Sequence, residues 1–273
     1  LCQTPEEGVE LVEAARHSKS IVQVGTQRRS YDLFLKARQL VAAGTLGKVR
    51  MVRSWWLNNQ VQPYAPRRLA GPLDWEQWQG PAAHHPLDPM RFFHWRSFSD
   101  YSGGIMADQG AHVFDGIHML MNAGYPIAVS ASAGRIHVPG VDTPDIVTVA
   151  AEYPEDFIAV FTINYAAMKY KARNDQLNQF DGDLARLDIG RENFWVYKQG
   201  EEEKAVRSEA SGGFGLASEA HVANFLECVR TRATPNAPVE RGFQGALIVQ
   251  MANIALQHGR RVRWNDAQKK VEI

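Results

Sequence analysis

The chain has 273 residues, with 30 basic and 30 acidic side chains, so its formal net charge is zero when the histidines are neutral. This length allows one large domain or two smaller ones, and the balanced charge argues against nucleic acid or an anionic membrane as a partner. Cys2 and Cys228 form no disulfide framework, no apolar run approaches the roughly 20 residues of a membrane span, and the opening LCQTPEEGVE does not resemble a signal peptide. We therefore expect a cytoplasmic protein, unless an export signal lies upstream of Leu1.

The first 58 residues predict an alternation of helix and strand. Residues 4–20 predict a helix with Thr4 as its N-cap and Pro5 in its first turn, where proline is tolerated. The apolar run IVQVGTQ, residues 21–27, is typical of a buried strand of an α/β sheet. A second helix, ended by glycines, and a second strand are predicted next, over residues 30–47 and 48–57.

Residues 59–103 are rich in proline, tryptophan, histidine and arginine and have weak periodicity. A long irregular segment in a compact protein is usually a functional loop or a lid. The alternative is an excursion that is anchored by its aromatic side chains and only packs against the rest of the protein. The sequence leaves both interpretations open.

The second half of the chain is mostly β-rich. Five segments in close succession predict an antiparallel or mixed sheet: residues 127–136, 146–154, 157–165, 184–190 and 192–199. Two helices then close the chain. One is expected to start at an N-cap Ser218, and the other spans residues 241–261 and ends at Gly259.

A dinucleotide-binding fold would require a glycine-rich turn between a strand and a helix, where backbone N–H groups approach phosphates. The nearest match is GFGLAS, residues 213–218, and we predict no strand in the residues before it, 201–212. The motif therefore lacks its structural context. We expect no pyrophosphate cradle in this chain.

The stretch GGIMADQGAHVFDGIHML, residues 103–120, carries a polar stripe on a predicted helix over residues 108–122. Asp108, His112 and Asp115 stand at positions i, i+4 and i+7 and so share one side of the helix. A histidine flanked by carboxylates is expected to have a raised pKa and to exchange a proton with a hydroxyl group. The alternatives are a solvated polar face and, less favoured because His118 lies off the stripe, a metal site.

Several segments, in order, resemble the glucose–fructose oxidoreductase / inositol dehydrogenase (Gfo/Idh/MocA) family. The segment that resembles the family's signature of Gly-Gly followed by Asp-x-Gly-x-His-x-x-Asp is GGIMADQGAHVFD. Residues 1–29 resemble the segment after the family's Glu-Lys-Pro motif. Residues 40–56 resemble the start of its C-terminal domain, and residues 221–256 resemble its closing helices. The matches span nearly the whole chain, and their joint order is more specific than any one of them.

The resemblance implies an α/β (α+β) protein with two parts. Residues 1–27 would be the C-terminal remnant of an NAD(P)-binding Rossmann domain. Residues 28–273 would form a substrate-binding and oligomerisation domain with a large open mixed or antiparallel sheet and helices on one face. The outer face of that sheet would join a homodimer or homotetramer, and the substrate would be a sugar or polyol.

The resemblance also implies roles for individual residues. His112 would be the acid/base at a secondary hydroxyl group that loses a hydride to nicotinamide, with Asp108 and Asp115 in support. Arg96 and Tyr101 would bind substrate hydroxyl groups, and Gln27 and Arg28 would face the junction of cofactor and substrate.

Two departures from the family pattern affect this prediction. The glycine-rich turn and the lysine of the Glu-Lys-Pro motif are both missing from the sequence. We therefore expect a fragment of a longer dehydrogenase, which binds NAD or NADP poorly and is inactive by itself. The alternatives are a non-catalytic carbohydrate-binding or oligomerisation domain and an NAD-dependent glycosidase of the same family.

Overall fold

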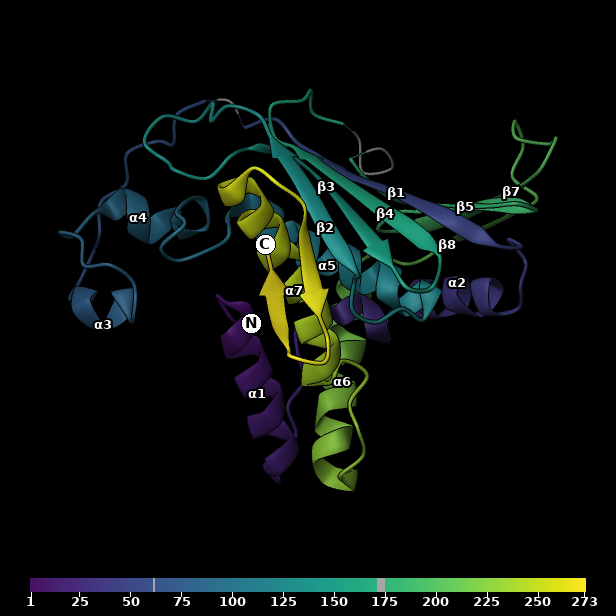
Figure 1. The fold of residues 1–273 in the computed structure, drawn as a ribbon, viewed down its shortest axis with the longest axis horizontal. Helices are drawn as coiled ribbons and strands as arrows, with labels where there is room; N and C mark the ends of the chain where they lie inside the picture. The colour runs from purple at the N-terminus through teal and green to yellow at the C-terminus, as the bar shows by residue number, and fades with distance from the viewer. Residues whose placement is uncertain (61, 171–174) are drawn as a thin grey trace.

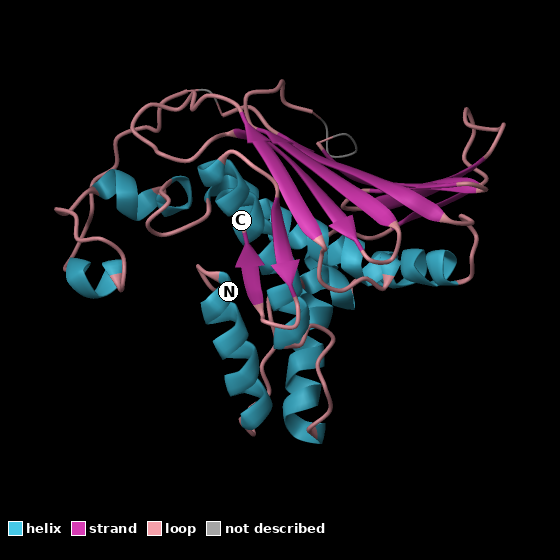
Figure 2. Cartoon of the chain, viewed as in Figure 1, coloured by secondary structure: helices cyan, strands magenta, loops and turns pink. Residues whose placement is uncertain are grey.

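The computed structural model describes residues 1–60, 62–170 and 175–273, which form a twisted sheet with helices packed against one face (Figures 1 and 2). Within these residues the sheet has ten strands in the spatial order β10-β9-β2-β3-β4-β1-β5-β6-β7-β8. The neighbours β1 and β4 run parallel, and the other pairs are antiparallel. This confirms the expected large, open, mixed sheet with helices on one face.

The strands in chain order are β1 (Val49–Leu57), β2 (Ala128–Ala133), β3 (Ile146–Tyr153), β4 (Phe157–Asn164), β5 (Gln176–Gly182), β6 (Ala185–Ile189), β7 (Asn193–Lys198), β8 (Arg207–Ala210), β9 (Val262–Asn265) and β10 (Lys270–Glu272). The α-helices are α1 (Pro5–His17), α2 (Asp32–Ala42), α3 (Trp75–Gln79), α4 (Pro89–Phe93), α5 (Gly104–Met121), α6 (Gly215–Thr231) and α7 (Val239–His258). Two short 3₁₀ helices are η1 (Gln27–Ser30) and η2 (Trp95–Ser97). No helix of the described residues is both long and apolar enough to cross a bilayer.

The predicted end signals of two helices are confirmed. Thr4 caps α1 by accepting a hydrogen bond from the backbone N–H of Glu7, and Pro5 follows at the first helical position. At the other end of the chain, Gly259 adopts the left-handed conformation that ends α7.

The predicted strand over residues 21–27 is wrong for the described residues. Its one ladder contact is an isolated bridge between Gln23 and Pro238, together with a hydrogen bond from the Val24 N–H to the Ala237 carbonyl. A strand needs a neighbour that offers both donors and acceptors, and Pro238 has no backbone N–H. The residues at the end of this run form η1 instead.

Two predictions near α6 are also wrong. The helix begins at Gly215 and not after an N-cap at Ser218, which lies inside its first turn. The residues before it do contain a strand, β8, which pairs antiparallel with β7 at the edge of the sheet. That strand is too short and polar to show a hydrophobic pattern, and β5, whose buried positions include Gln176 and Asn178, was missed for the same reason.

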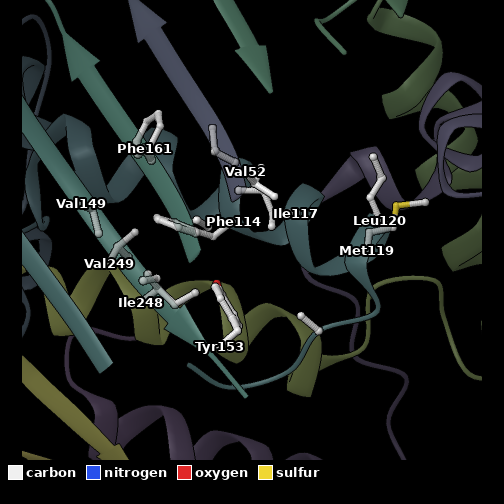
Figure 3. Close-up of a cluster of buried hydrophobic side chains, with 14 of the residues drawn as sticks. Val52, Phe114, Ile117, Met119, Leu120, Val149, Tyr153, Phe161, Ile248 and Val249 are labelled. Carbon is white, nitrogen blue, oxygen red and sulfur yellow. The ribbon is translucent and has the colours of Figure 1, made fainter. Parts of the chain in front are cut away.

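The core lies between the sheet and the helices α5 and α7 (Figure 3). Val113, Ile117 and Leu120 recur at helical spacing on α5 and are buried. The two helices pack closely because Gly245 of α7 brings its backbone next to α5, where an added Cβ would lie 3.1 Å from the Ala111 carbonyl oxygen. This close contact fixes the position of α5 under the sheet.

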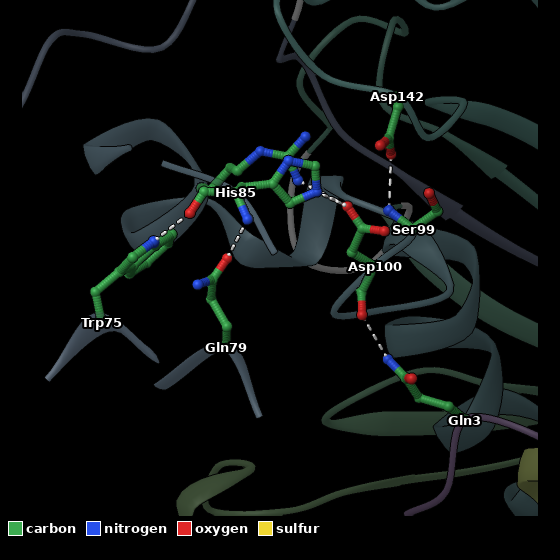
Figure 4. A network of polar contacts seen from close by, with 8 residues as sticks. Gln3, Trp75, Gln79, His85, Ser99, Asp100 and Asp142 are labelled. Carbon is green, nitrogen blue, oxygen red and sulfur yellow. Dashed lines mark hydrogen bonds and ion pairs between the residues drawn. The ribbon is translucent and has the colours of Figure 1, made fainter. Parts of the chain in front are cut away.

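The excursion over residues 59–103 packs around its own aromatic cluster and polar network, although residue 61 lies outside the described residues. Trp78 stacks on Trp75 and meets Phe92 and Tyr101 at an angle. Figure 4 shows the network around Asp100. The Asp100 carbonyl oxygen accepts a hydrogen bond, 2.9 Å long, from the side chain of Gln3, which precedes α1. The Asp100 carboxylate is hydrogen-bonded to the ring of His85. The excursion is therefore held in place by packing, and some of its residues also line a pocket described below.

Candidate active site

The helix α5 carries the predicted polar stripe. It begins at Gly104, four residues earlier than expected, so Asp108 lies in its second turn and not at its N-terminus. The two glycines at its start allow close approach by other segments, as predicted: an added Cβ on Gly103 would lie 2.5 Å from Nδ2 of Asn253, and one on Gly104 would lie 2.9 Å from Cβ of Thr143.

Asp115 is fully buried, with 0 % of its surface exposed. Its Oδ1 accepts a hydrogen bond from Nε of Arg29, 2.7 Å away, and the Arg29 side chain is itself 10 % exposed. Burial raises the pKa of Asp115 to about 6, against the opposing effect of Arg29. Asp115 is therefore not part of a solvated face.

His112 is partly buried in the middle of the stripe. Burial and the nearby Arg28 guanidinium lower its pKa to about 4, and Asp108 acts in the opposite direction. The expectation of a raised pKa is wrong, because the sequence pattern showed the two carboxylates but neither the burial of the imidazole, which has the larger effect, nor the arginine beneath the helix. At neutral pH the imidazole is uncharged and able to accept a proton.

Asp108 is paired with Arg96, whose Nε lies 3.1 Å from Oδ1 of the carboxylate. The amide of Gln109 donates to the other carboxylate oxygen at 2.9 Å. Arg96 and Asp108, to which the resemblance gave separate roles, are therefore in contact. Tyr101 packs instead against Trp78 in the excursion.

Gln27 and Arg28 lie on η1 and point to different surroundings. Oε1 of Gln27 is buried without a hydrogen-bond partner among the described residues. Arg28 is 2 % exposed and donates from Nη1 to the carbonyl oxygen of His112, 3.3 Å away. Of the two, Gln27 is the residue with an unused polar atom for a ligand.

A small pocket, partly open to solvent, lies between the excursion and the segment that joins β2 to β3. Its lining includes Tyr64, Ser97, Thr143, Asp145 and Tyr165. Tyr165 also lies close enough to Asp108 for that carboxylate, together with burial, to raise the pKa of its hydroxyl group. The pocket therefore lies on the same side of the molecule as the Asp108 end of the stripe.

Sequence reasoning missed Arg29 and Tyr165. The sequence offered a signal for Arg29, because it is one of two adjacent arginines directly after an apolar run, where a buried charge is plausible. In the structure Arg29 neutralises the buried Asp115. Tyr165 had none, because it looked like the last residue of an ordinary buried strand.

The described residues do not fit a dinucleotide by themselves. The loop before α6 follows a strand, β8, that the sequence did not predict, but β8 has no parallel neighbour to complete a βαβ unit. Among the described residues, no group of three or more His, Cys, Asp and Glu side chains is arranged to hold a metal ion.

Comparison with known proteins identifies a matching family and similar folds. The model of the GFO/IDH/MocA C-terminal domain matches residues 34–187. A solved oxidoreductase domain protein from Kribbella flavida is 20% identical, with a TM-score of 0.73 over 97% of this chain and 72% of that one. No curated protein sequence matches the chain significantly.

Two other similar structures contain ligands. Levoglucosan dehydrogenase in complex with NADH and levoglucosan is 17% identical, with a TM-score of 0.71 over 96% of this chain and 71% of that one. An inositol dehydrogenase homolog from Azotobacter vinelandii, complexed with NADH and myo-inositol, is 16% identical, with a TM-score of 0.71 over 97% of this chain and 70% of that one. At these identities the likeness establishes a shared fold.

Proposed function

This chain belongs to the GFO/IDH/MocA family, and on that premise we propose that it is the substrate-binding half of an NAD(P)-dependent oxidoreductase acting on a secondary hydroxyl group of a sugar or polyol. The observation that carries the proposal is His112, a partly buried imidazole on a helix side shared with two carboxylates. An uncharged imidazole in this setting is suited to accept the proton of a hydroxyl group.

The proton step follows from the chain's own residues. When a secondary alcohol is oxidised to a ketone, the hydroxyl proton would pass to a ring nitrogen of His112. A nicotinamide, when bound, would supply the hydride acceptor. Asp108 stabilises the imidazolium that results, because an opposite charge one helical turn away favours the charged form. Asp115 supports the site by fixing η1 to α5 through Arg29.

Substrate hydroxyl groups would meet the Asp108–Arg96 pair at the mouth of the site. Arg96 is half exposed and stacked over Trp95, with 4.3 Å between the guanidinium carbon and the ring centroid. Such an arginine can donate a hydrogen bond to a substrate hydroxyl group while it keeps its ion pair with the Asp108 carboxylate. Tyr101 would contribute only to a substrate that extends over the excursion.

The hydride acceptor needs a phosphate cradle that the described residues lack, so no step of the proton path passes through the cofactor. We assign residues 1–27 to the C-terminal part of a nucleotide-binding domain and residues 28–273 to the substrate-binding domain. Gln27, at the boundary, would face the nicotinamide with its unpartnered Oε1. NAD and NADP are both compatible with this assignment.

The helix-free face of the sheet is proposed to join a homodimer or homotetramer. Met51 and Ile158 are paired across β1 and β4 on this face and are 37% and 41% exposed. Beside them, Arg53 of β1 forms an ion pair with Asp181 of the neighbouring strand β5. A sheet face of this composition is commonly covered by a second copy.

The test is turnover of a panel of sugars and polyols with NAD or NADP, measured on the complete gene product that contains this chain. Replacing His112 by alanine should lower kcat by about 10²–10⁴-fold, the usual contribution of a general base. The matched control is His258→Ala, an exposed histidine at the end of α7, which should leave turnover unchanged. Wild-type turnover by the His112 variant would disprove the assignment.

The second candidate is a non-catalytic carbohydrate-binding or oligomerisation domain, which is favoured by the missing phosphate cradle. It predicts saturable binding of a sugar in calorimetry and no consumption of NAD or NADP by the wild-type protein. Detection of a reduced nicotinamide product would rule it out.

A further inference from the structure

We propose that Arg28 is a positioning residue, whose buried guanidinium holds the backbone of α5 at His112 and keeps the imidazole in its neutral, proton-accepting form. The proposal rests on the function assigned to His112 above and gives Arg28 a role that acts through the histidine and not through the cofactor.

Arg28 lies in a slot between η1 and α5. Its Nη1 donates to the carbonyl oxygen of His112 at 3.3 Å, and its guanidinium carbon lies 5.2 Å from the centroid of the Phe34 ring. The slot exists because α5 has a glycine at position 116: a Cβ there would lie 3.5 Å from Nη1 of Arg28 and 3.3 Å from Cε1 of Phe34. The guanidinium can therefore approach the backbone of the helix directly.

The charge of Arg28 is not neutralised by a carboxylate of its own. Asp115, the nearest acidic residue to act on it, is hydrogen-bonded to Arg29. Burial lowers the pKa of Arg28 to about 10, so the group is still charged at neutral pH. In a poorly solvated site such a charge acts strongly on its neighbours.

Two charged groups act on His112 from the elements around it. Arg28 on η1 lowers the pKa of the imidazole, and Asp108 on α5 itself raises it. Asp108 is shared with Arg96 of η2, which weakens its effect. From α7, Asn253 contacts Gly103 just before α5, and Arg241 acts on His118 near the C-terminal end of α5. The buried side chains Val249, Phe34, Phe161 and Val52, from α7, α2, β4 and β1, are apolar.

The consequence for the reaction concerns the protonation state of His112. A neutral imidazole is available to take the hydroxyl proton over the whole physiological pH range. Once His112 is protonated, the fixed cation beside it favours release of that proton, so the base is restored for the next turnover.

The test is an NMR titration of the His112 ring in the purified protein, with the resonance assigned by its loss in a His112→Asn variant. Wild-type His112 should titrate near pH 4. Arg28→Gln keeps a donor for the His112 carbonyl and removes the charge, so it should raise the pKa of His112 by roughly 1. Arg28→Lys keeps the charge and should leave the pKa close to the wild-type value.

The matched control is Arg38→Gln, which removes an exposed arginine of α2 and should not change the titration. A folded Arg28→Gln variant with an unchanged His112 pKa would overturn the proposal. If that variant does not fold, a wild-type His112 that titrates at pH 6 or above would overturn it as well. Because the readout needs no turnover, it is independent of the His112→Ala assay that tests the proposed function.

Discussion

Replacing Arg29 by methionine would test whether the buried ion pair under α5 behaves as the structure indicates. The substitution removes the hydrogen-bond partner of Asp115, whose carboxylate is fully buried and bonded to Nε of Arg29 at 2.7 Å. Because burial already raises the pKa of Asp115 to about 6, well above its value in an unfolded chain, this group favours folding most when it is protonated. That contribution is lost as the pH rises through 6.

The size of the effect follows from this pKa. Without Arg29 the pKa of Asp115 rises further. The cost of burying the charged carboxylate is limited, because the group becomes neutral once it binds a proton. At pH 8, two pH units above its present pKa, the added pH-dependent cost is therefore at most about 2.7 kcal/mol, at 1.36 kcal/mol for each pH unit. At pH 5 the carboxyl group is protonated in both proteins, and this part of the cost disappears.

Urea unfolding followed by tryptophan fluorescence at pH 5 and pH 8 would measure the difference. The double variant Arg29→Met/Asp115→Leu removes both charges and should recover most of the stability lost at pH 8, since a buried pair replaced by apolar side chains is often neutral. Arg38→Met, on the exposed side of α2, is the control for loss of a positive charge. A cost for Arg29→Met that is the same at both pH values would refute the buried ion pair.

Three further predictions concern other parts of the molecule. Burial lowers the pKa of His118 to about 3, so the stabilising effect of this group is present above pH 6.5 and is lost as the pH falls. Wild-type protein should lose about 2 kcal/mol of unfolding free energy from this group between pH 6.5 and 5. The His118→Gln variant should lose less over the same pH range in urea titrations. Gly104→Ala should destabilise by about 1–3 kcal/mol, because φ is +81° and the new Cβ would meet Thr143, and an unchanged Tm in calorimetry would contradict this. The pair Met51→Glu and Ile158→Glu should dissociate any oligomer formed through the open sheet face, and light scattering that shows the same mass for variant and wild type would exclude that interface.

Local signals were sufficient for much of the fold. The ends of α1 and α7 were predicted because Thr4, Pro5 and Gly259 act within one helical turn of their own backbone. Strands with alternating burial, such as β3 and β4, were found from their pattern. Strands β5 and β8 were missed because neighbouring strands, and not their own composition, make them part of the sheet.

The incorrect prediction of a strand over residues 21–27 also arises because the neighbours of a segment decide whether it forms a strand. An apolar extended run becomes a strand only when another segment supplies backbone partners, and here the available partner is Pro238. Pattern and propensity describe what a segment is able to do, and its neighbours decide what it does.

For the candidate site, the sequence by itself determined that Asp108, His112 and Asp115 share one side of a helix, because their spacing fixes that geometry. Only the tertiary structure decided the charge state of each group, because pKa values depend on burial and on charges brought from elsewhere in the chain. Arg28 and Arg29 lie against α5 although they are 84 and 86 residues away in sequence from the residues they contact there, His112 and Asp115. Burial and Arg28 turn a histidine expected to be readily protonated into one with a pKa of about 4, and Arg29 makes a supporting carboxylate half of a buried ion pair.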